Sequence, residues 1–353
     1  MKKEARRGAF AIDTAAHLAA AAAKAAWWTA AGRATRALVK PTEGEQAKAF
    51  EPTTPPVSSE RLRKAYLSAF SKDARDVAAG LYPAMDTEVD PGEVFRRAAD
   101  VLTDAKAVDQ RRRKAQATEV RESVNSKAYP SYYRQNFHYQ SGGWFTEDSA
   151  KRYEAQVEAL FSGAAGAMRR RALSLLAKAL RGRDQRGLKI ADIACGSGGF
   201  LKDLHAAFPR AKLMGVDLSP TYAAEARARS GAPVIQANAE RLPFADVSLD
   251  AVTCIYLFHE LPPRVRTVVA REIARVLKPG GVLAFADSVQ PSDEPDLARL
   301  LEAFPAFFHE PFYGSYATTD LPALFTKAGL SLEGEDKAFL TKALSFTKIN
   351  HTI

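Results

Sequence analysis

From Leu188 onward, short apolar runs alternate with helical segments, and this alternation constrains the fold of the 353-residue chain more than any other feature. The pattern is typical of β-α-β units, whose crossovers are right-handed. We expect strands at 189–193, 212–216, 233–236, 250–255 and 282–287, helices near 199–208, 219–230, 263–277 and 319–328, and a strand pair within 331–349. The sequence therefore predicts an α/β fold with a doubly wound, Rossmann-like sheet.

The first predicted strand runs into a glycine-rich turn, in the sequence LKIADIACGSGGF at 188–200. Glycine permits positive φ and lets a ligand approach the backbone closely. Ligands of such sheets lie outside the carboxyl ends of the strands, so we expect a cofactor at this turn. A nicotinamide fingerprint, G-x-G-x-x-G, would fit only with Ala194 at its first position, followed by Gly196 and Gly199. No GxxxxGK[ST] phosphate-binding sequence occurs.

Three further motifs follow in order along the chain. Asp217 ends the second predicted strand, where a carboxylate can accept charge-assisted hydrogen bonds from both hydroxyls of a ribose. Asn238 lies in IQANAERLPF after the third strand, in a place to accept a hydrogen bond from an adenine amino group. A helix, a Pro-Gly-Gly turn and a strand then follow in REIARVLKPGGVLAFADS at 271–288.

With these motifs, the chain from about 188 to 350 resembles the class I S-adenosylmethionine-dependent methyltransferases. Ala194 stands where the family usually has its first glycine, and Asn238 where aspartate is commonest. The resemblance implies seven strands with the last pair antiparallel, and S-adenosyl-L-methionine as cofactor. The LPF segment and the LKPGG turn resemble the branch that methylates quinones, sterols and other lipids. The cofactor contacts that the resemblance implies are Asp192, Ala194, Cys195, Gly196, Gly198, Asp217, Leu218, Asn238, Ala239 and Ile255.

The family places substrate contacts just after the fourth strand, which here is CIYLFHELPPR at 254–264. We predict His259 and Glu260 as catalytic residues. His259 titrates naturally near neutral pH and is the candidate general base, or it only shapes the pocket. Glu260 orients His259 or favours the start of the next helix. No second histidine follows at helical spacing, so we expect no metal.

Two aromatic clusters accompany these motifs, YPSYYRQNFHYQSGGWF at 129–145 and FPAFFHEPFYGSY at 304–316. In similar enzymes the segment before the first strand closes over the site, and the insertion after the fifth strand faces the substrate. Simple packing of the first cluster on the sheet is the alternative. Two aromatic clusters would suit a planar or lipid-like acceptor. The predicted substrate contacts are Tyr133, His138, Tyr139, Tyr256, Phe308, His309 and Tyr313.

The net charge of the chain is +9, and the excess lies before the predicted sheet. Residues 1–187 carry a net +11 and residues 188–353 a net −2. We therefore assign the charge to the N-terminal extension and do not expect a nucleic-acid partner. The alanine-rich stretch 14–31 predicts a helix ending at Gly32, and its lysine and weak apolarity argue against a membrane span. It is a surface helix or disordered arm, an interfacial helix for peripheral membrane contact, or an organelle transit peptide.

We expect four segments. Residues 1–59 form a basic arm and a Pro/Thr-rich linker, and 60–128 a helical extension. Residues 129–187 form the aromatic lid and one helix from about 147 to 180, with Leu160 among its buried positions, and 188–353 the methyltransferase domain. We expect a cytoplasmic protein.

The leading hypothesis is an enzyme that methylates a small, hydrophobic or aromatic molecule by direct displacement. An RNA or protein methyltransferase and a non-catalytic cofactor-binding scaffold are the alternatives. The acceptor atom and the oligomeric state stay open.

Overall fold

The computed structural model describes residues 2–38, 50–85, 91–124 and 126–350. Its centre is one seven-stranded sheet in the order β3-β2-β1-β4-β5-β7-β6. Strands β1 to β5 are parallel, and β7 is antiparallel to both β5 and β6. The strands are β1 (Lys189–Ile193), β2 (Lys212–Asp217), β3 (Val234–Gln236), β4 (Leu249–Ile255), β5 (Leu277–Ser288), β6 (Leu330–Ala338) and β7 (Thr341–Lys348). The predicted fold, with its antiparallel last pair, is confirmed.

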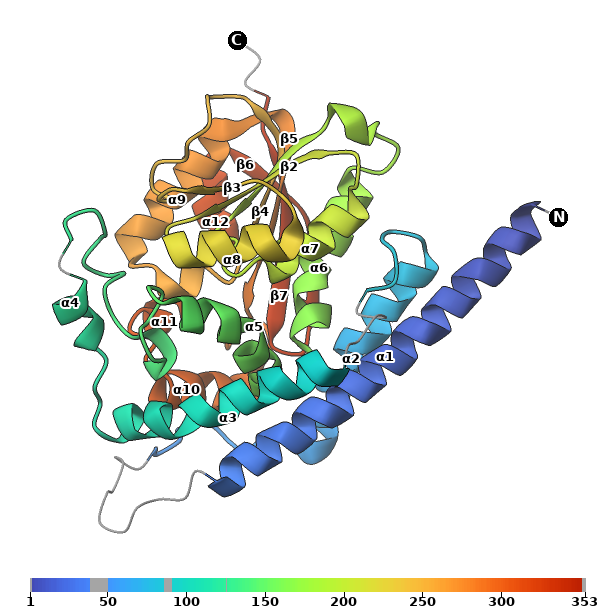
Figure 1. Ribbon diagram of the computed structural model, residues 1–353. Helices are drawn as coiled ribbons and strands as arrows, with labels where there is room; N and C mark the ends of the chain where they lie inside the picture. Colours follow the sequence, from blue (N-terminus) through green and yellow to red (C-terminus); the bar gives the residue numbers. More distant parts are fainter. Residues whose placement is uncertain (1, 39–49, 86–90, 125, 351–353) are drawn as a thin grey trace.

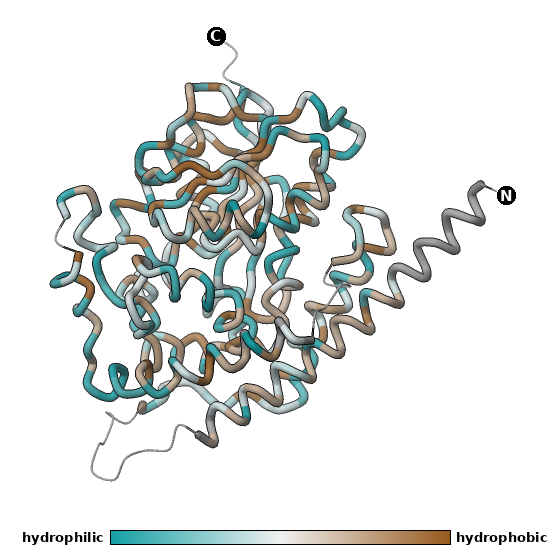
Figure 2. Tube along the Cα trace, viewed as in Figure 1, coloured by the Kyte–Doolittle hydropathy of each residue, from teal (hydrophilic) through white to brown (hydrophobic). Residues whose placement is uncertain are grey.

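The two faces of the sheet alternate residue by residue, as the pleat of a strand requires. Ile190 and Ala284 lie in one apolar cluster, while their neighbours Ala191 and Phe285 lie in the other. Helices cover both faces, so the parallel strands are mostly apolar, whereas the edge strand β6 carries exposed charged residues such as Glu333. Figure 2 shows the hydrophobic residues gathered along the central strands.

Helices α6, α7 and α8 pack on the first face, and α9 and α12 on the second. Their bounds are α6 (Ala165–Ala179), α7 (Gly199–Ala207), α8 (Pro220–Ser230), α9 (Pro263–Val276) and α12 (Leu321–Lys327). Shorter elements cover the carboxyl ends of the strands: α4 (Glu119–Ser123), η1 (Phe137–Tyr139), α5 (Glu147–Leu160), η3 (Phe258–Glu260), η4 (Pro295–Leu297), α10 (Ala298–Phe307) and α11 (Tyr313–Ala317). A single turn, η2 (Gln185–Gly187), precedes β1.

Two sequence predictions about helices were wrong. Helix α1 (Lys2–Leu38) continues through Gly32, whose position tolerates a Cβ because its nearest neighbour would be 3.9 Å away. The predicted helix 147–180 is two helices, because Ser162 and Gly163 adopt positive φ between α5 and α6. Leu160, expected to be buried, is 40% exposed at the end of α5.

Helix α1 packs against α2 (Ser59–Ala78), α3 (Pro91–Arg113) and α5 rather than standing apart as an arm. Trp28 of α1 is buried beside Ala155 of α5. A Cβ on Gly163 would come within 3.0 Å of the Ala25 backbone, so glycine lets α1 approach the α5–α6 connection closely. Part of the predicted linker, residues 39–49, lies outside the described residues.

A buried network of ion pairs connects helices α1 and α2 to the helices that cover the sheet. Nε2 of His17 lies 2.7 Å from the Asp73 carboxylate, which also receives Nη2 of Arg170 at 2.8 Å. Arg170 reaches on to Asp203 of α7 at 3.0 Å. The network therefore joins α1, α2, α6 and α7, and residues 14–38 of α1 belong to the folded body.

Among the described residues, none of the helices combines the length and apolarity needed to cross a membrane.

Candidate functional site

The glycine-rich turn after β1 is held in a left-handed backbone conformation. Ala194, Gly196 and Gly198 have φ of 56°, 56° and 83°. A Cβ on Gly198 would lie 2.7 Å from Cα of Ala226, so glycine is required there for α8 to pack against the turn. Ala194 adopts the same region without glycine's freedom, and such strain gathers at functional sites. The turn therefore presents its backbone to the end of β2.

Asp217, at the end of β2, is fixed by this turn. Its Oδ2 accepts a hydrogen bond of 2.8 Å from the backbone N–H of Gly196, and its Oδ1 accepts one of 2.8 Å from Ser219. Burial raises the pKa of the Asp217 carboxyl to about 6. Each carboxylate oxygen has a second lone pair, so the side chain keeps the capacity to accept from a ligand's hydroxyls.

Asp192, at the end of β1, lies just beneath the turn and is almost fully buried. Its Oδ1 accepts from the Thr253 hydroxyl at 2.7 Å, whereas Oδ2 has no partner among the described residues. Burial raises the pKa of Asp192 to about 7. A buried carboxylate oxygen without a partner is unfavourable, so a charged Asp192 is costly in this position.

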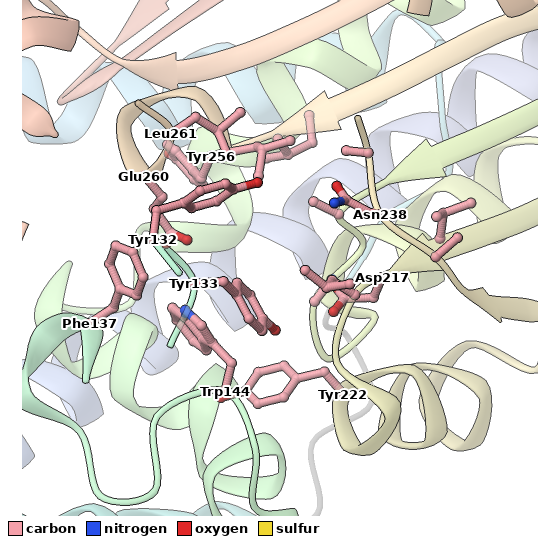
Figure 3. A pocket seen from close by; sticks show the side chains of 18 of the residues that line it. Tyr132, Tyr133, Phe137, Trp144, Asp217, Tyr222, Asn238, Tyr256, Glu260 and Leu261 are labelled. Carbon is pink, nitrogen blue, oxygen red and sulfur yellow. The ribbon is translucent and has the colours of Figure 1, made fainter. Parts of the chain in front are cut away.

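Ala194, Gly196 and Asp217 border a cavity with an empty volume of about 810 Å³ between the sheet and the aromatic segment. Figure 3 shows Tyr133 and Trp144 of that segment in the cavity with Asp217 and Asn238 on the facing side. Trp144 is buried, and its indole N–H has no partner among the described residues. Oδ1 of Asn238 accepts from the backbone N–H of Glu240 at 2.9 Å, which fixes the side chain at the cavity wall.

A second cavity, with an empty volume of about 660 Å³, adjoins the first. Tyr153, Tyr256 and Glu260 line both cavities, so the two meet at these side chains. The second cavity is lined mainly by apolar side chains from α5, α10 and the loop before β7: Val157, Leu160, Phe161, Leu300, Leu301, Phe304 and Leu340. Its polar lining consists of His138, His259, Ser288 and Tyr313, besides the shared residues.

His259 lies in η3, directly after β4, and is buried against β5. Its Nδ1 lies 2.6 Å from Oδ1 of Asp287, and Oδ2 of Asp287 accepts from the backbone N–H groups of Phe258 and His259. Burial opposes the charged imidazolium, but the Asp287 carboxylate outweighs it and raises the pKa of His259 to about 10. His259 is therefore charged at neutral pH.

The structure brings most of the predicted cofactor residues to the first cavity. Ala194, Gly196, Asp217, Leu218, Asn238, Ala239 and Ile255 line it, whereas Asp192, Cys195 and Gly198 support the turn from below. Of the predicted substrate contacts, His138, Tyr256 and Tyr313 line the second cavity and Tyr133 the first. Tyr139, Phe308 and His309 line neither cavity.

Several lining residues escaped prediction. Tyr153 and Leu301 lie on ordinary amphipathic helices, which carry no sequence signal for a site. Asp287 ends β5 in the sequence FADS, the same place that Asp192 and Asp217 take on their strands, and this repeated strand-end position was an available signal.

Part of the chain is similar in sequence to known methyltransferases. Residues 190–281 match the family described as "Methyltransferase domain". An uncharacterized methyltransferase of Synechocystis sp. is 32% identical over 152 residues, which cover 41% of this chain and 68% of that protein. The ubiquinone/menaquinone biosynthesis C-methyltransferase UbiE of Desulfotalea psychrophila is 28% identical over 172 residues, 46% of this chain and 67% of that one.

Among solved structures, magnesium protoporphyrin IX methyltransferase from Synechocystis PCC 6803 with bound SAH gives a TM-score of 0.40 at 15% identity, over 56% of this chain and 87% of that chain. The uncharacterized methyltransferase of Synechocystis sp. is similar enough, over enough of its length, to show the family, and the matched domain agrees with it. The chain belongs to the S-adenosylmethionine-dependent methyltransferases.

Proposed function

We propose that the protein transfers a methyl group from S-adenosylmethionine to a small hydrophobic or aromatic molecule. The observation that carries the proposal is the pair of adjoining cavities. One is bordered by the cofactor motifs, the other is mostly apolar, and they meet at Tyr153, Tyr256 and Glu260.

The residues of the first cavity fit the cofactor. The Asp217 carboxylate suits ribose hydroxyls, and Asn238 and Ala239 lie where the resemblance expects the adenine. Trp144 also lines this cavity, and its unpartnered indole N–H suits the carboxylate group of the methionine part. The bound cofactor supplies an activated methyl group on a sulfonium, so the protein's part is to align the acceptor with it.

The lining of the cavities supports a small neutral acceptor. Among the described residues, neither cavity is lined by Lys or Arg, although the chain has 50 such residues. A polyanion such as RNA depends on these cations for its affinity. The similar UbiE protein is named for methylation in quinone biosynthesis, which also supports an apolar ring system as acceptor.

We propose that Glu260, which lines both cavities, acts as the catalytic residue and that His259, which lines the second cavity beside it, positions it. Peripheral membrane contact through residues 1–40 remains a separate proposal that would bring the enzyme to lipid acceptors.

The test is incubation of the purified protein with methyl-labelled S-adenosylmethionine and a cell extract separated into lipid, RNA and protein fractions. Label in the lipid or small-molecule fraction is expected. Label confined to RNA or protein would overturn the proposed acceptor class. The variant Asp217→Ala is the negative control, since it removes the ribose contact.

A further inference from the structure

Glu260 occupies a singular position between the two cavities. It lines both, as Tyr153 and Tyr256 also do, but it alone of the three carries a carboxyl group. Neither of its carboxylate oxygens has a hydrogen bond to a described residue. In the close view, Glu260 lies beside Tyr256 and Leu261, and Asp217 lies across the cavity. The carboxyl is therefore available where the methyl group and the acceptor atom must meet.

Two histidines flank this carboxyl. Nε2 of His259 lies 3.9 Å from Oε1 of Glu260, and Nε2 of His138 lies 4.0 Å from the same oxygen. Both distances exceed a hydrogen bond. They leave the carboxylate oxygen unbound while keeping it within the electrostatic reach of both rings.

The carboxyl groups behind the two histidines differ in their hydrogen bonds. Asp287 accepts from the backbone N–H groups of Phe258, His259 and Ser288, in addition to the His259 ring. Such donors stabilise a charged carboxylate, and the charged carboxylate in turn keeps His259 protonated. The ion pair therefore places the positive ring of His259 next to Glu260, with the negative carboxylate of Asp287 behind that ring.

Glu310, behind His138, is the opposite case. Its side chain is fully buried, and neither oxygen has an assigned hydrogen bond to a described residue, although Nδ1 of His138 lies 3.1 Å from Oε1. Burial raises the pKa of Glu310 well above its ordinary value, so it is an uncharged acid. Burial, with His259 and His309 nearby, lowers the pKa of His138 to about 3, so this ring is neutral.

Of Glu260, Glu310 and the two histidines, Glu260 is the group whose charge changes near neutral pH. Burial raises its pKa, the positive charge of His259 opposes the rise, and Asp287 and Asp217 add to it. The neutral ring of His138 adds no charge. A base is most effective when its pKa lies near the working pH. Desolvation moves the pKa of Glu260 upward, towards neutral pH.

We propose that Glu260 is the general base of the methyl transfer, and that His259, locked as an imidazolium by Asp287, is the positioning residue that keeps Glu260 ionised. The inference rests on the proposed function and narrows it. The acceptor is a molecule whose reacting group loses a proton, a hydroxyl or an enol, rather than a tertiary amine or a thioether.

The step balances as follows. The acceptor atom forms its bond to the methyl carbon with a lone pair of the hydroxyl oxygen or with the electron pair of the enol C=C bond. The bond from that carbon to sulfur breaks with both electrons staying on sulfur. The proton of the acceptor group passes to the Glu260 carboxylate. The sulfonium charge is lost, and the methylated acceptor leaves neutral with the carboxyl protonated.

The first test needs no acceptor. The Glu260 carboxyl is titrated by carbon-13 NMR in the full chain, with its signal assigned by its loss in Glu260→Gln. A midpoint above the ordinary glutamate range is expected in the unaltered protein. In His259→Gln, the midpoint rises by about one pH unit or more, since a nearby positive charge is lost. A midpoint near the ordinary value, or one that His259→Gln leaves unchanged, would overturn the proposal.

The second test measures transfer of labelled methyl from S-adenosylmethionine into the lipid extract as a function of pH. Glu260→Gln is expected to lower the rate by about 10²–10⁴-fold. Cofactor affinity should be unchanged by calorimetry with S-adenosylhomocysteine. His259→Gln moves the acidic limb of the rate profile to higher pH, whereas a purely structural role would lower the rate equally at every pH.

The matched control is Glu333→Gln, an exposed glutamate on β6 that lines neither cavity. Full activity in Glu260→Gln would contradict its role as base while leaving the proposed function intact. Absence of transfer by the unaltered protein into any fraction would instead contradict the proposed function.

Discussion

The carboxylate of Asp217 accepts a hydrogen bond of 2.8 Å from the backbone N–H of Gly196, so the end of β2 and the turn after β1 fix one another. This contact holds the acidic side chain at the wall of the first cavity in the absence of a ligand. Because the Asp217 carboxylate is already oriented, little side-chain entropy is lost when a ribose binds to it.

Asp217→Ala should therefore weaken S-adenosylmethionine binding by about 100-fold or more. Two charge-assisted hydrogen bonds are each worth about 1.5–3 kcal/mol, and about 1.4 kcal/mol corresponds to tenfold in affinity. Isothermal calorimetry measures the loss, and circular dichroism checks that the fold persists. Asp184→Ala is the control, since Asp184 is exposed and pairs with Arg186 beside it. Equal affinity for S-adenosylmethionine in Asp217→Ala and Asp184→Ala would show that Asp217 does not contact the cofactor.

Asp192→Asn should stabilise the cofactor-free protein at pH 8 by about 1–3 kcal/mol, because it removes a buried charge with an unpartnered oxygen. The pKa of Asp192 is raised to about 7 in the folded state, above the unfolded value. The gain is therefore complete above pH 7 and disappears as the pH falls towards 4, where aspartate is protonated in both states. Urea unfolding at several pH values measures it, with Asp184→Asn as control. Destabilisation at pH 8 would contradict the assigned burial cost.

Val157→Trp should raise the apparent KM for the acceptor by about tenfold or more, which corresponds to about 1.4 kcal/mol. Val157 lines the second cavity and not the first, so the larger side chain fills acceptor space only. The affinity for S-adenosylhomocysteine should stay the same. Val268→Trp serves as control, because Val268 is 39% exposed on α9. A loss of cofactor affinity with no change in KM would reverse the assignment of the cavities.

Asp73→Ala should destabilise the protein by about 3–5 kcal/mol, because it leaves Arg170 and His17 without their shared carboxylate in a buried position. Arg170 and His17 overcome the effect of burial and hold the pKa of Asp73 well below its ordinary value. Urea unfolding measures the change, with Asp100→Ala on the exposed side of α3 as control. A free energy of unfolding that Asp73→Ala leaves almost unchanged would mean that this network does not stabilise the packing of α1.

The sheet and the cofactor cavity were predictable because their signals are local. Buried parallel strands appear as apolar runs, and the turn at Gly196 and Gly198 needs its glycines for backbone reasons that the sequence shows directly. The strand-end position of Asp217 follows from the same pattern. These features depend on neighbours along the chain rather than on tertiary packing.

The acceptor side was less predictable because it depends on distant contacts. Asp287 and His259 are 28 residues apart and meet only because β4 and β5 are adjacent in the sheet. Within the aromatic segment, positive φ at His138 and Tyr139 turns the chain, so that His138 lines the second cavity and Tyr139 does not. The continuation of α1 through Gly32 likewise depends on packing against α5 that local propensity does not encode.

A crystal structure with S-adenosylhomocysteine tests the central claim most directly, since it locates the sulfur that carries the methyl group in the active cofactor. The account predicts that the ribose hydroxyls contact Asp217 and that the sulfur lies at the junction formed by Tyr153, Tyr256 and Glu260, facing the second cavity. A sulfur directed away from that junction, or a ligand outside the first cavity, would contradict it.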